Sequence, residues 1–275
     1  MSLSKELKKK HNQDSLKNII EAYLSTNPKL PSFQFIVSRN KLIGFHPSGL
    51  HYACPRAIAF GFIFEKGLYT ERILEDEIGN PESWITPKLR RTFDTGHMIH
   101  ALVQYAYLKE FDDCEIEVPI ESLHEKYLIG GTADIVMKMQ SGKKRIWDIK
   151  TMGNGSFQGV DENNYKSIAE GYITQADLYM FGLKIFDYGI LCWNKDNGDL
   201  KEVLFSFDKE RVKPALVSAV KGRKFLLGEK ILILDECKKS VGRYKNCPYS
   251  SICFRCKDKN VLEYTTCKSN SDLIK

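Results

Sequence analysis

Apolar residues recur at helical spacing in several long segments of the chain. In one of them, Ile99, Leu102, Val103, Ala106 and Tyr107 fall on a single helical face. A helix is also expected to begin at Pro55, since proline is favoured in the first turn. The segments with this spacing are residues 14–24, 87–110, 168–185 and 209–227, with a shorter one near 229–237.

Shorter runs that alternate or stay apolar predict β-strands. The runs are residues 115–120, 132–139, 145–149, 189–193 and 201–207. Between these elements, residues 68–86 are polar and contain Gly79-Asn80-Pro81, which indicates an insertion. Glycine and asparagine turn signals within residues 151–166 indicate a loop.

Two carboxylates and a lysine are expected to meet on the hairpin formed by the second and third predicted strands. A turn centred near Ser141-Gly142 places Asp134 opposite Ile149, next to Asp148 and Lys150. Asp148 and Lys150 share one face, because side chains along a strand repeat every second residue. The alternative interpretation is an ordinary surface hairpin with a salt bridge.

The chemistry of this group fits a divalent cation. Mg²⁺ and Mn²⁺ prefer carboxylate and water oxygens and often bind a substrate phosphate as well. Such a cation lowers the pKa of a bound water and offsets charge on phosphoryl oxygens. A lysine beside it can stabilise the charge that develops during phosphodiester hydrolysis.

Polar residues on two predicted helices add to the candidate site. His100 lies one turn after Gly96 and is a candidate nitrogen ligand, with His97 as its alternative. Gln175 and Tyr179 are four residues apart and therefore share a side of their helix. They can hydrogen-bond a scissile phosphate or stack on a base. Glu117 is either a further carboxylate near the site or a solvent-facing strand residue.

These residues form an ordered set of motifs. Gly-x3-His at Gly96/His100 is followed by Gly-x2-Asp at Gly131/Asp134, Asp-x-Lys at Asp148/Lys150 and Gln-x3-Tyr at Gln175/Tyr179. The set resembles the RecB-type branch of the PD-(D/E)XK nuclease superfamily. That resemblance implies an α/β fold with a restriction-endonuclease-like core, a mixed β-sheet flanked by helices, and metal-dependent cleavage of DNA.

The resemblance also implies a role for each residue. It makes His100, Asp134 and Asp148 metal ligands, with the carbonyl of Ile149 as a further one. It makes Lys150 the catalytic ammonium, and Gln175 and Tyr179 residues that position the substrate.

The cysteines indicate a second metal centre. The chain has eight of them, and its first ten residues are polar and lysine-rich, unlike a signal peptide. In the reducing setting that this implies, clustered cysteines indicate metal binding rather than disulfides. Cys247, Cys253 and Cys256 fall in one short segment, and Cys54 stands alone near the start. Four thiolates suit either a [4Fe–4S] cluster or Zn²⁺.

A remote first cysteine with a C-terminal trio resembles the iron–sulfur subgroup of these nucleases. The subgroup includes the CRISPR adaptation nuclease, the AddB subunit and the nuclease domain of a eukaryotic helicase-nuclease. The resemblance implies a [4Fe–4S] cluster on Cys54, Cys247, Cys253 and Cys256, which joins the N- and C-terminal segments. The usual spacing is Cys-x2-Cys-x5-Cys, whereas this chain has Cys-x5-Cys-x2-Cys. Cys237 is therefore the alternative fourth ligand.

The net charge of +6 suits a polyanionic partner without proving one. Basic residues gather before the His100 helix, at the hairpin and on a later helix, where they either follow phosphates or form solvated faces. They are Lys88, Arg90, Arg91, Lys143, Lys144, Arg145, Lys213, Lys221, Arg223 and Lys224. Arg56 is expected to contact a phosphate or to pair with an acid. The sequence contains no apolar stretch long enough to span a bilayer.

From these patterns and resemblances we expect an N-terminal extension (1–46), a nuclease domain closed by the cysteines (47–256) and a tail (257–275). The expected activity is a Mg²⁺- or Mn²⁺-dependent deoxyribonuclease in the cytoplasm, most simply an exonuclease on DNA ends or single strands. Helicase, integrase or single-strand-binding partners fit the alternative of a subunit in a CRISPR adaptation or recombination complex. A non-catalytic DNA-binding scaffold is the third interpretation.

Overall fold

The computed structural model describes residues 14–25, 42–52, 54–68, 87–111, 115–231, 247, 249, 252–253, 262 and 265–274. They divide into two compact units. The sheet unit consists of Met1–Lys41, Pro87–Ile120 and Thr132–Asp208, and the helical unit consists of Leu42–Thr86, Glu121–Gly131 and Lys209–Lys275. The expected boundaries at residues 46 and 256 stay a prediction.

The sheet unit contains a five-stranded mixed sheet in the order β1-β2-β3-β4-β5. All neighbouring strands are antiparallel except β3 and β4, which are parallel. The strands are β1 (Glu115–Pro119), β2 (Thr132–Lys138), β3 (Lys144–Met152), β4 (Asp187–Asn194) and β5 (Leu200–Ser206). The helices are α2 (Leu16–Ser25), α5 (Pro87–Glu110), α7 (Asn154–Gln158) and α8 (Glu170–Leu183), with a short 3-10 turn, η5 (Tyr165–Ser167).

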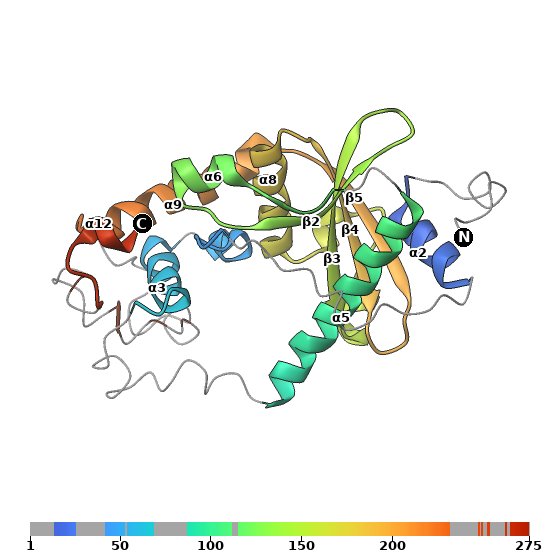
Figure 1. Cartoon of the computed structure of the whole chain (residues 1–275), viewed down its shortest axis with the longest axis horizontal. Helices are drawn as coiled ribbons and strands as arrows, with labels where there is room; N and C mark the ends of the chain where they lie inside the picture. The colour runs from blue at the N-terminus through green and yellow to red at the C-terminus, as the bar shows by residue number, and fades with distance from the viewer. Residues whose placement is uncertain are drawn as a thin grey trace. The chain divides into compact units, whose positions relative to one another are not determined.

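Helices flank this sheet, and α5 runs across its strands (Figure 1). Apolar residues of α2 and α5 pack on Trp147 and Ile149 of β3, and these residues form a fully buried core. Asp148 lies between those two residues in sequence and therefore projects from the other face of the strand. That face meets α8, whose Gln175 contacts Asp148. The sheet is thus apolar around Trp147 and Ile149 on the face under α2 and α5, and it carries Asp148 and Lys150 on the face under α8.

Gly189 allows the core to pack closely across the parallel pair. Its Cα lies beside Trp147 in the register of β3 and β4. A Cβ at this position would lie 2.4 Å from the Trp147 ring, closer than non-bonded carbon atoms can approach. Only glycine leaves room for the indole, which is fully buried.

The helical unit contains α3 (Pro55–Glu65), α6 (Glu121–Tyr127), α9 (Lys209–Leu226), α12 (Asn270–Leu273) and a 3-10 segment, η2 (Pro47–Tyr52). Helices α3 and α9 pack together. Gly222 of α9 lies against Ile58, where a Cβ would approach the isoleucine to 2.9 Å, and the rings of Phe60 and Phe225 meet edge to face at 5.7 Å.

Most of the expected elements are confirmed within one or two residues, but two expectations are wrong. Residues 151–166 are not a continuous loop, because β3 extends to Met152 and α7 follows it. The hairpin register also differs by one residue: Ile135 pairs with Trp147, and Lys138 pairs with Lys144. This register places Asp134 across from Asp148 rather than Ile149.

Turn geometry explains the difference in register. Met139 donates its N–H to the carbonyl of Lys143, and Gly142 adopts a left-handed φ of 80°. The turn is therefore centred on Ser141 and not between Ser141 and Gly142. A register slip of one residue would turn the whole strand over. The observed pairing is the one that directs both carboxylates to the same face.

Two expectations fall largely outside the described residues. They are the insertion at 68–86 and the helix near 229–237. No helix among the described residues is both long and apolar enough to cross a membrane.

Candidate functional site

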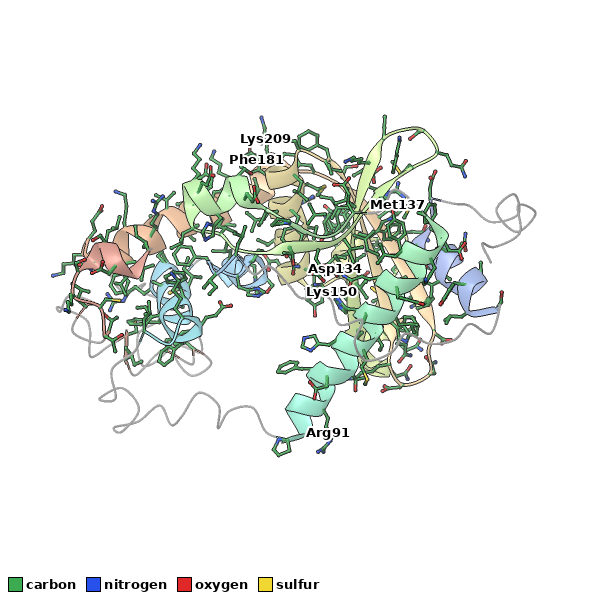
Figure 2. The ribbon with its side chains drawn as sticks, in the orientation of Figure 1. Arg91, Asp134, Met137, Lys150, Phe181 and Lys209 are labelled. Atoms are coloured by element: carbon green, nitrogen blue, oxygen red, sulfur yellow. The ribbon has the colours of Figure 1, made fainter. Side chains whose placement is uncertain are left out.

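Six residues singled out from the sequence come together in the sheet unit. They lie on four separate elements, and each touches at least one other member of the group. The group consists of His100 on α5, Asp134 on β2, Asp148 and Lys150 on β3, and Gln175 and Tyr179 on α8. Figure 2 labels Asp134 and Lys150, which lie beside each other at the sheet.

Asp134 sits where the ladder between β2 and β3 ends. The last paired residues are Ile135 and Trp147. Beyond them, the Asp134 Oδ2 atom accepts a hydrogen bond of 2.7 Å from the Ile149 N–H. A buried backbone donor needs a partner, and here a carboxylate supplies it. The same oxygen lies 3.4 Å from Nδ1 of His100. Asp134 is thus held between the strand and helix α5.

Asp148 and Lys150 form a buried ion pair. The Lys150 Nζ lies 2.6 Å from Asp148 Oδ2, and both side chains are shielded from solvent. Gln175 bridges the pair: its amide donates to Asp148 Oδ1 at 3.4 Å, and its carbonyl oxygen accepts from Lys150 at 3.4 Å. The same amide donates to the Tyr179 hydroxyl at 3.2 Å. Helix α8 therefore orients both charges.

The two carboxylates titrate in opposite directions. Burial tends to raise the pKa of Asp134, but His100, Lys150 and the Ile149 N–H outweigh it and lower that pKa to about 2. Burial raises the pKa of Asp148 to about 6, which Lys150 opposes and the charge of Asp134 reinforces. Two adjacent carboxylates with separated pKa values are typical of sites that transfer protons or bind cations.

The basic groups respond to those carboxylates. Burial tends to lower the pKa of Lys150, yet Asp148 and Asp134 outweigh it and the pKa is raised. Burial likewise tends to lower the pKa of His100, and Asp134 outweighs it so that the pKa is raised. Burial raises the pKa of Tyr179 well above its usual value, so the phenol stays protonated near neutral pH. Lys150 therefore stays positively charged at neutral pH and below.

Gly96 explains how α5 brings His100 to the sheet. A Cβ at Gly96 would lie 3.2 Å from the Thr151 hydroxyl of β3. A Cβ there would be a tight fit, so glycine allows α5 to lie close to β3 one turn before His100.

Glu117 belongs to this neighbourhood, together with Gln104, which the sequence analysis missed. Gln104 donates to Glu117 Oε1 at 2.8 Å and to the Asp134 carbonyl at 3.2 Å. The other Glu117 oxygen accepts from Thr132 at 2.9 Å. Glu117 has a positive φ of 49°, which is rare for a residue with a side chain and often marks a functional site. Periodicity gives no sign of this conformation.

Tyr172 is a second residue that the sequence analysis missed. The Lys150 Nζ lies 4.7 Å from the centre of its ring, a cation–π contact. Tyr172 precedes Gln175 by three residues on α8, so helical spacing was the available signal.

The donor atoms of this site suit Mg²⁺ or Mn²⁺, although they do not surround a single point. Two carboxylates and an imidazole are ligands that these ions accept, and the His100 Nδ1 faces the Asp134 carboxylate at 3.4 Å. Within the described ranges, however, no three His, Cys, Asp or Glu side chains are arranged to hold a metal ion. The Ile149 N–H, rather than its carbonyl, faces Asp134. The role of each residue as a ligand stays a prediction.

Three of the four predicted cluster cysteines are described, and all lie in the helical unit. Burial raises the pKa of Cys253, Arg56 opposes the rise, and Cys54 and Cys247 add to it, so these thiols lie within electrostatic range of one another. Cys256 and its alternative Cys237 lie outside the described residues. Cys192 lies on β4 and is fully buried, and burial raises its pKa to about 12, as expected of a packing residue.

Arg56 connects two cysteine-bearing segments. Its guanidinium, 2% exposed, donates to Cys253 Sγ at 3.1 Å, to the Cys253 carbonyl at 2.8 Å and to the Ile231 carbonyl at 2.9 Å. It also lies 4.6 Å from the centre of the Phe225 ring. Neither expectation from the sequence, a phosphate contact or pairing with an acid, describes these contacts.

Replacing Arg56 with methionine is expected to destabilise the protein by about 3 kcal/mol, because buried acceptors lose their donors. Urea unfolding followed by circular dichroism measures the change. The control is Arg223→Met, which removes one exposed hydrogen bond to the Lys126 carbonyl and should cost under about 1 kcal/mol. Equal midpoints for the two variants would contradict this account of Arg56.

Some of the basic residues at the hairpin pair with acids of the same sheet. Lys144 contacts Glu115, and Arg145 binds both oxygens of Asp187 at 2.8 and 3.1 Å. These pairs favour a structural role for Lys144 and Arg145 over contacts with phosphates.

Comparison with known proteins assigns no family. No family model matches the sequence, and no curated protein matches it. Among solved structures, the crystal structure of SSO0001 shares 16% identity with this chain and superposes with a TM-score of 0.43. The alignment covers 86% of this chain and 93% of that one. A likeness this remote carries no argument about function.

Proposed function

We propose that this protein is a divalent-metal-dependent DNA nuclease of the RecB-like PD-(D/E)XK type. It would hydrolyse phosphodiester bonds, acting as an exonuclease on DNA ends or single strands. The observation that carries the proposal is the meeting of Asp134 and Asp148, from adjacent strands, beside the buried ammonium of Lys150.

Asp134, Asp148 and His100 would hold the cation, with the Ile149 carbonyl as the further ligand implied by the resemblance. When bound, Mg²⁺ or Mn²⁺ supplies Lewis-acid stabilisation of the phosphate and a more acidic water. The types of donor atom fit this role. Asp134 stays ionised down to about pH 2, and Asp148 loses its proton at about pH 6.

The remaining residues act on the substrate. Lys150 offers a permanent positive charge to the phosphate oxygens, where a positioned donor stabilises charge as it builds. Gln175 fixes the orientation of that ammonium through its carbonyl oxygen. The Tyr179 hydroxyl accepts a hydrogen bond from the Gln175 amide, and its raised pKa keeps it protonated at neutral pH.

The cysteines of the helical unit are proposed to bind a [4Fe–4S] cluster, with zinc as the alternative. Support comes from the proximity of Cys54, Cys247 and Cys253 and from the N–H of Arg56 directed at a sulfur atom. Hydrogen bonds to sulfur are among the features that tune such clusters.

Incubation of the purified protein with end-labelled single-stranded and duplex DNA tests the proposal. With Mn²⁺ we expect progressive shortening of the labelled strand, and with a chelator we expect none. Intact DNA under both conditions would remove the enzymatic assignment.

One observation favours a second candidate, a DNA-binding scaffold without catalysis. The oxygen Oδ2 of Asp148 is engaged by Lys150, and that of Asp134 by the Ile149 N–H. Such a closed cluster is also what a purely structural ion pair would show. In that case DNA would be bound and left uncut in the same assay.

The affinity for Mn²⁺ is expected to rise with pH from about one unit below the Asp148 pKa of about 6. Cation binding requires the ionised form of Asp148, whose pKa is about 6, and the neutral form of His100, whose pKa is raised. Below these values protons compete, and affinity falls about tenfold per pH unit for each group that must lose one. Titration calorimetry at pH 5, 6, 7 and 8 measures the slope. His100→Ala should make it shallower by one proton, and a flat profile would contradict this ligand set.

A further inference from the structure

The amino-terminal half of α5 is the most exposed feature beside the candidate site. From Ile99 onward the helix packs into the core through Val103, Ala106 and Tyr107. Before Ile99 the side chains are mostly exposed, with Phe93 at 48% and Met98 at 52%. Figure 2 shows Arg91 near the free end of this helix, away from Asp134 and Lys150.

One row of side chains along α5 runs from the site to that exposed end. Phe93, His97, His100 and Gln104 follow one another at spacings of four, three and four residues. Residues at these spacings are neighbours on a helix surface. Gln104 contacts the Asp134 carbonyl, and His100 contacts the Asp134 carboxylate. Phe93 and His97 therefore extend the site surface outward by about two turns.

We infer that this row, Phe93–His97–His100, is the path by which a single strand of DNA reaches the site, with a base stacked on Phe93. The inference rests on the proposed function and names its substrate class. Phe93 is exposed and lies in line with two residues that contact Asp134, and stacking on unpaired bases is a common use of such a ring. In a duplex the bases are already stacked, so a single strand is the form that such a ring recognises.

The charge of this segment agrees with a polyanionic occupant. Residues 87–98 contain Lys88, Arg90 and Arg91 against one acid, Asp94, a net charge of +2. His97 is exposed on the same helix.

Binding of a fluorescein-labelled oligothymidine to the full chain, followed by anisotropy, tests the inference. Every variant is made in a Lys150→Met background to suppress cleavage. Phe93→Ala should weaken binding about fivefold to a hundredfold. Phe93→Trp should retain tight binding, because the indole also stacks. The matched control is Met98→Ala, equally exposed but on the opposite side of the same helix, and it should bind as the background does.

The outcomes separate this inference from the proposed function. Equal binding by the Phe93→Ala and Met98→Ala proteins would overturn the path along α5. An equal loss of affinity for fully paired duplex would overturn base stacking. Both outcomes are measured as DNA binding and do not depend on cleavage. A negative nuclease assay would therefore contradict the proposed function without deciding whether DNA binds along α5. Thermal unfolding of the Phe93→Ala protein should match the background, since the side chain is half exposed.

Discussion

Replacing Lys150 with methionine is expected to lower Mn²⁺-dependent cleavage of single-stranded DNA by about 10²- to 10³-fold. Methionine keeps much of the length and volume of lysine and removes the charge. The loss follows because a preorganised donor is removed from the place where phosphate charge builds. Asp148→Asn should cause a loss at least as large, since it removes a carboxylate of the proposed metal site and the partner of Lys150.

Initial rates on an end-labelled oligonucleotide measure both effects. Lys138→Met is the control, because Lys138 lies at the exposed end of β2 and the substitution makes the same chemical change. It should leave the rate within about twofold of the wild type. Unaltered cleavage in both the Lys150→Met and Asp148→Asn proteins would place the chemistry elsewhere in the chain.

Replacing Cys253 with serine is expected to abolish the proposed cluster. Protein purified without oxygen should be brown, with absorbance near ~400 nm and about four iron atoms per chain. The Cys253→Ser protein should lose that colour, because a thiolate ligand and the sulfur contacted by Arg56 disappear together. Cys54→Ser should behave in the same way.

The control for this experiment is Cys267→Ser, a change in a partly exposed residue of the C-terminal segment. It should keep the iron content of the wild type. Colourless wild-type protein with stoichiometric zinc would exclude iron and leave the nuclease proposal intact. Wild-type protein without either metal would end the cluster hypothesis.

Local patterns predicted most of the described helices and strands. Residues 87–110 and 168–185 carry apolar residues at helical spacing, and α5 and α8 form there. The motif spacing also selected residues that meet in space, such as Asp148 with Lys150 and Gln175 with Tyr179. These pairs are close in sequence or follow the period of one element, so local geometry determines them.

Contacts between distant segments were not accessible in this way. Arg56 and Cys253 are 197 residues apart in the chain, and no periodicity connects them. The bridge from Gln104 to Glu117 depends on a backbone conformation at Glu117 that few side chains adopt. Helical spacing placed Tyr172 on the same side of α8 as Gln175, but its contact with Lys150 depends on how α8 packs on β3.

By itself the sequence determined which segments become helices and strands and which residue types gather near β3, because hydrophobic periodicity acts over a few residues. The tertiary structure decided the register that directs Asp134 and Asp148 to one face. Moving the centre of the turn by half a residue shifts the pairing by one residue, and that shift moves every side chain of the strand to the other face. The tertiary structure also decided the opposite titration of the two carboxylates, because burial and neighbouring charges exist only after the elements have packed.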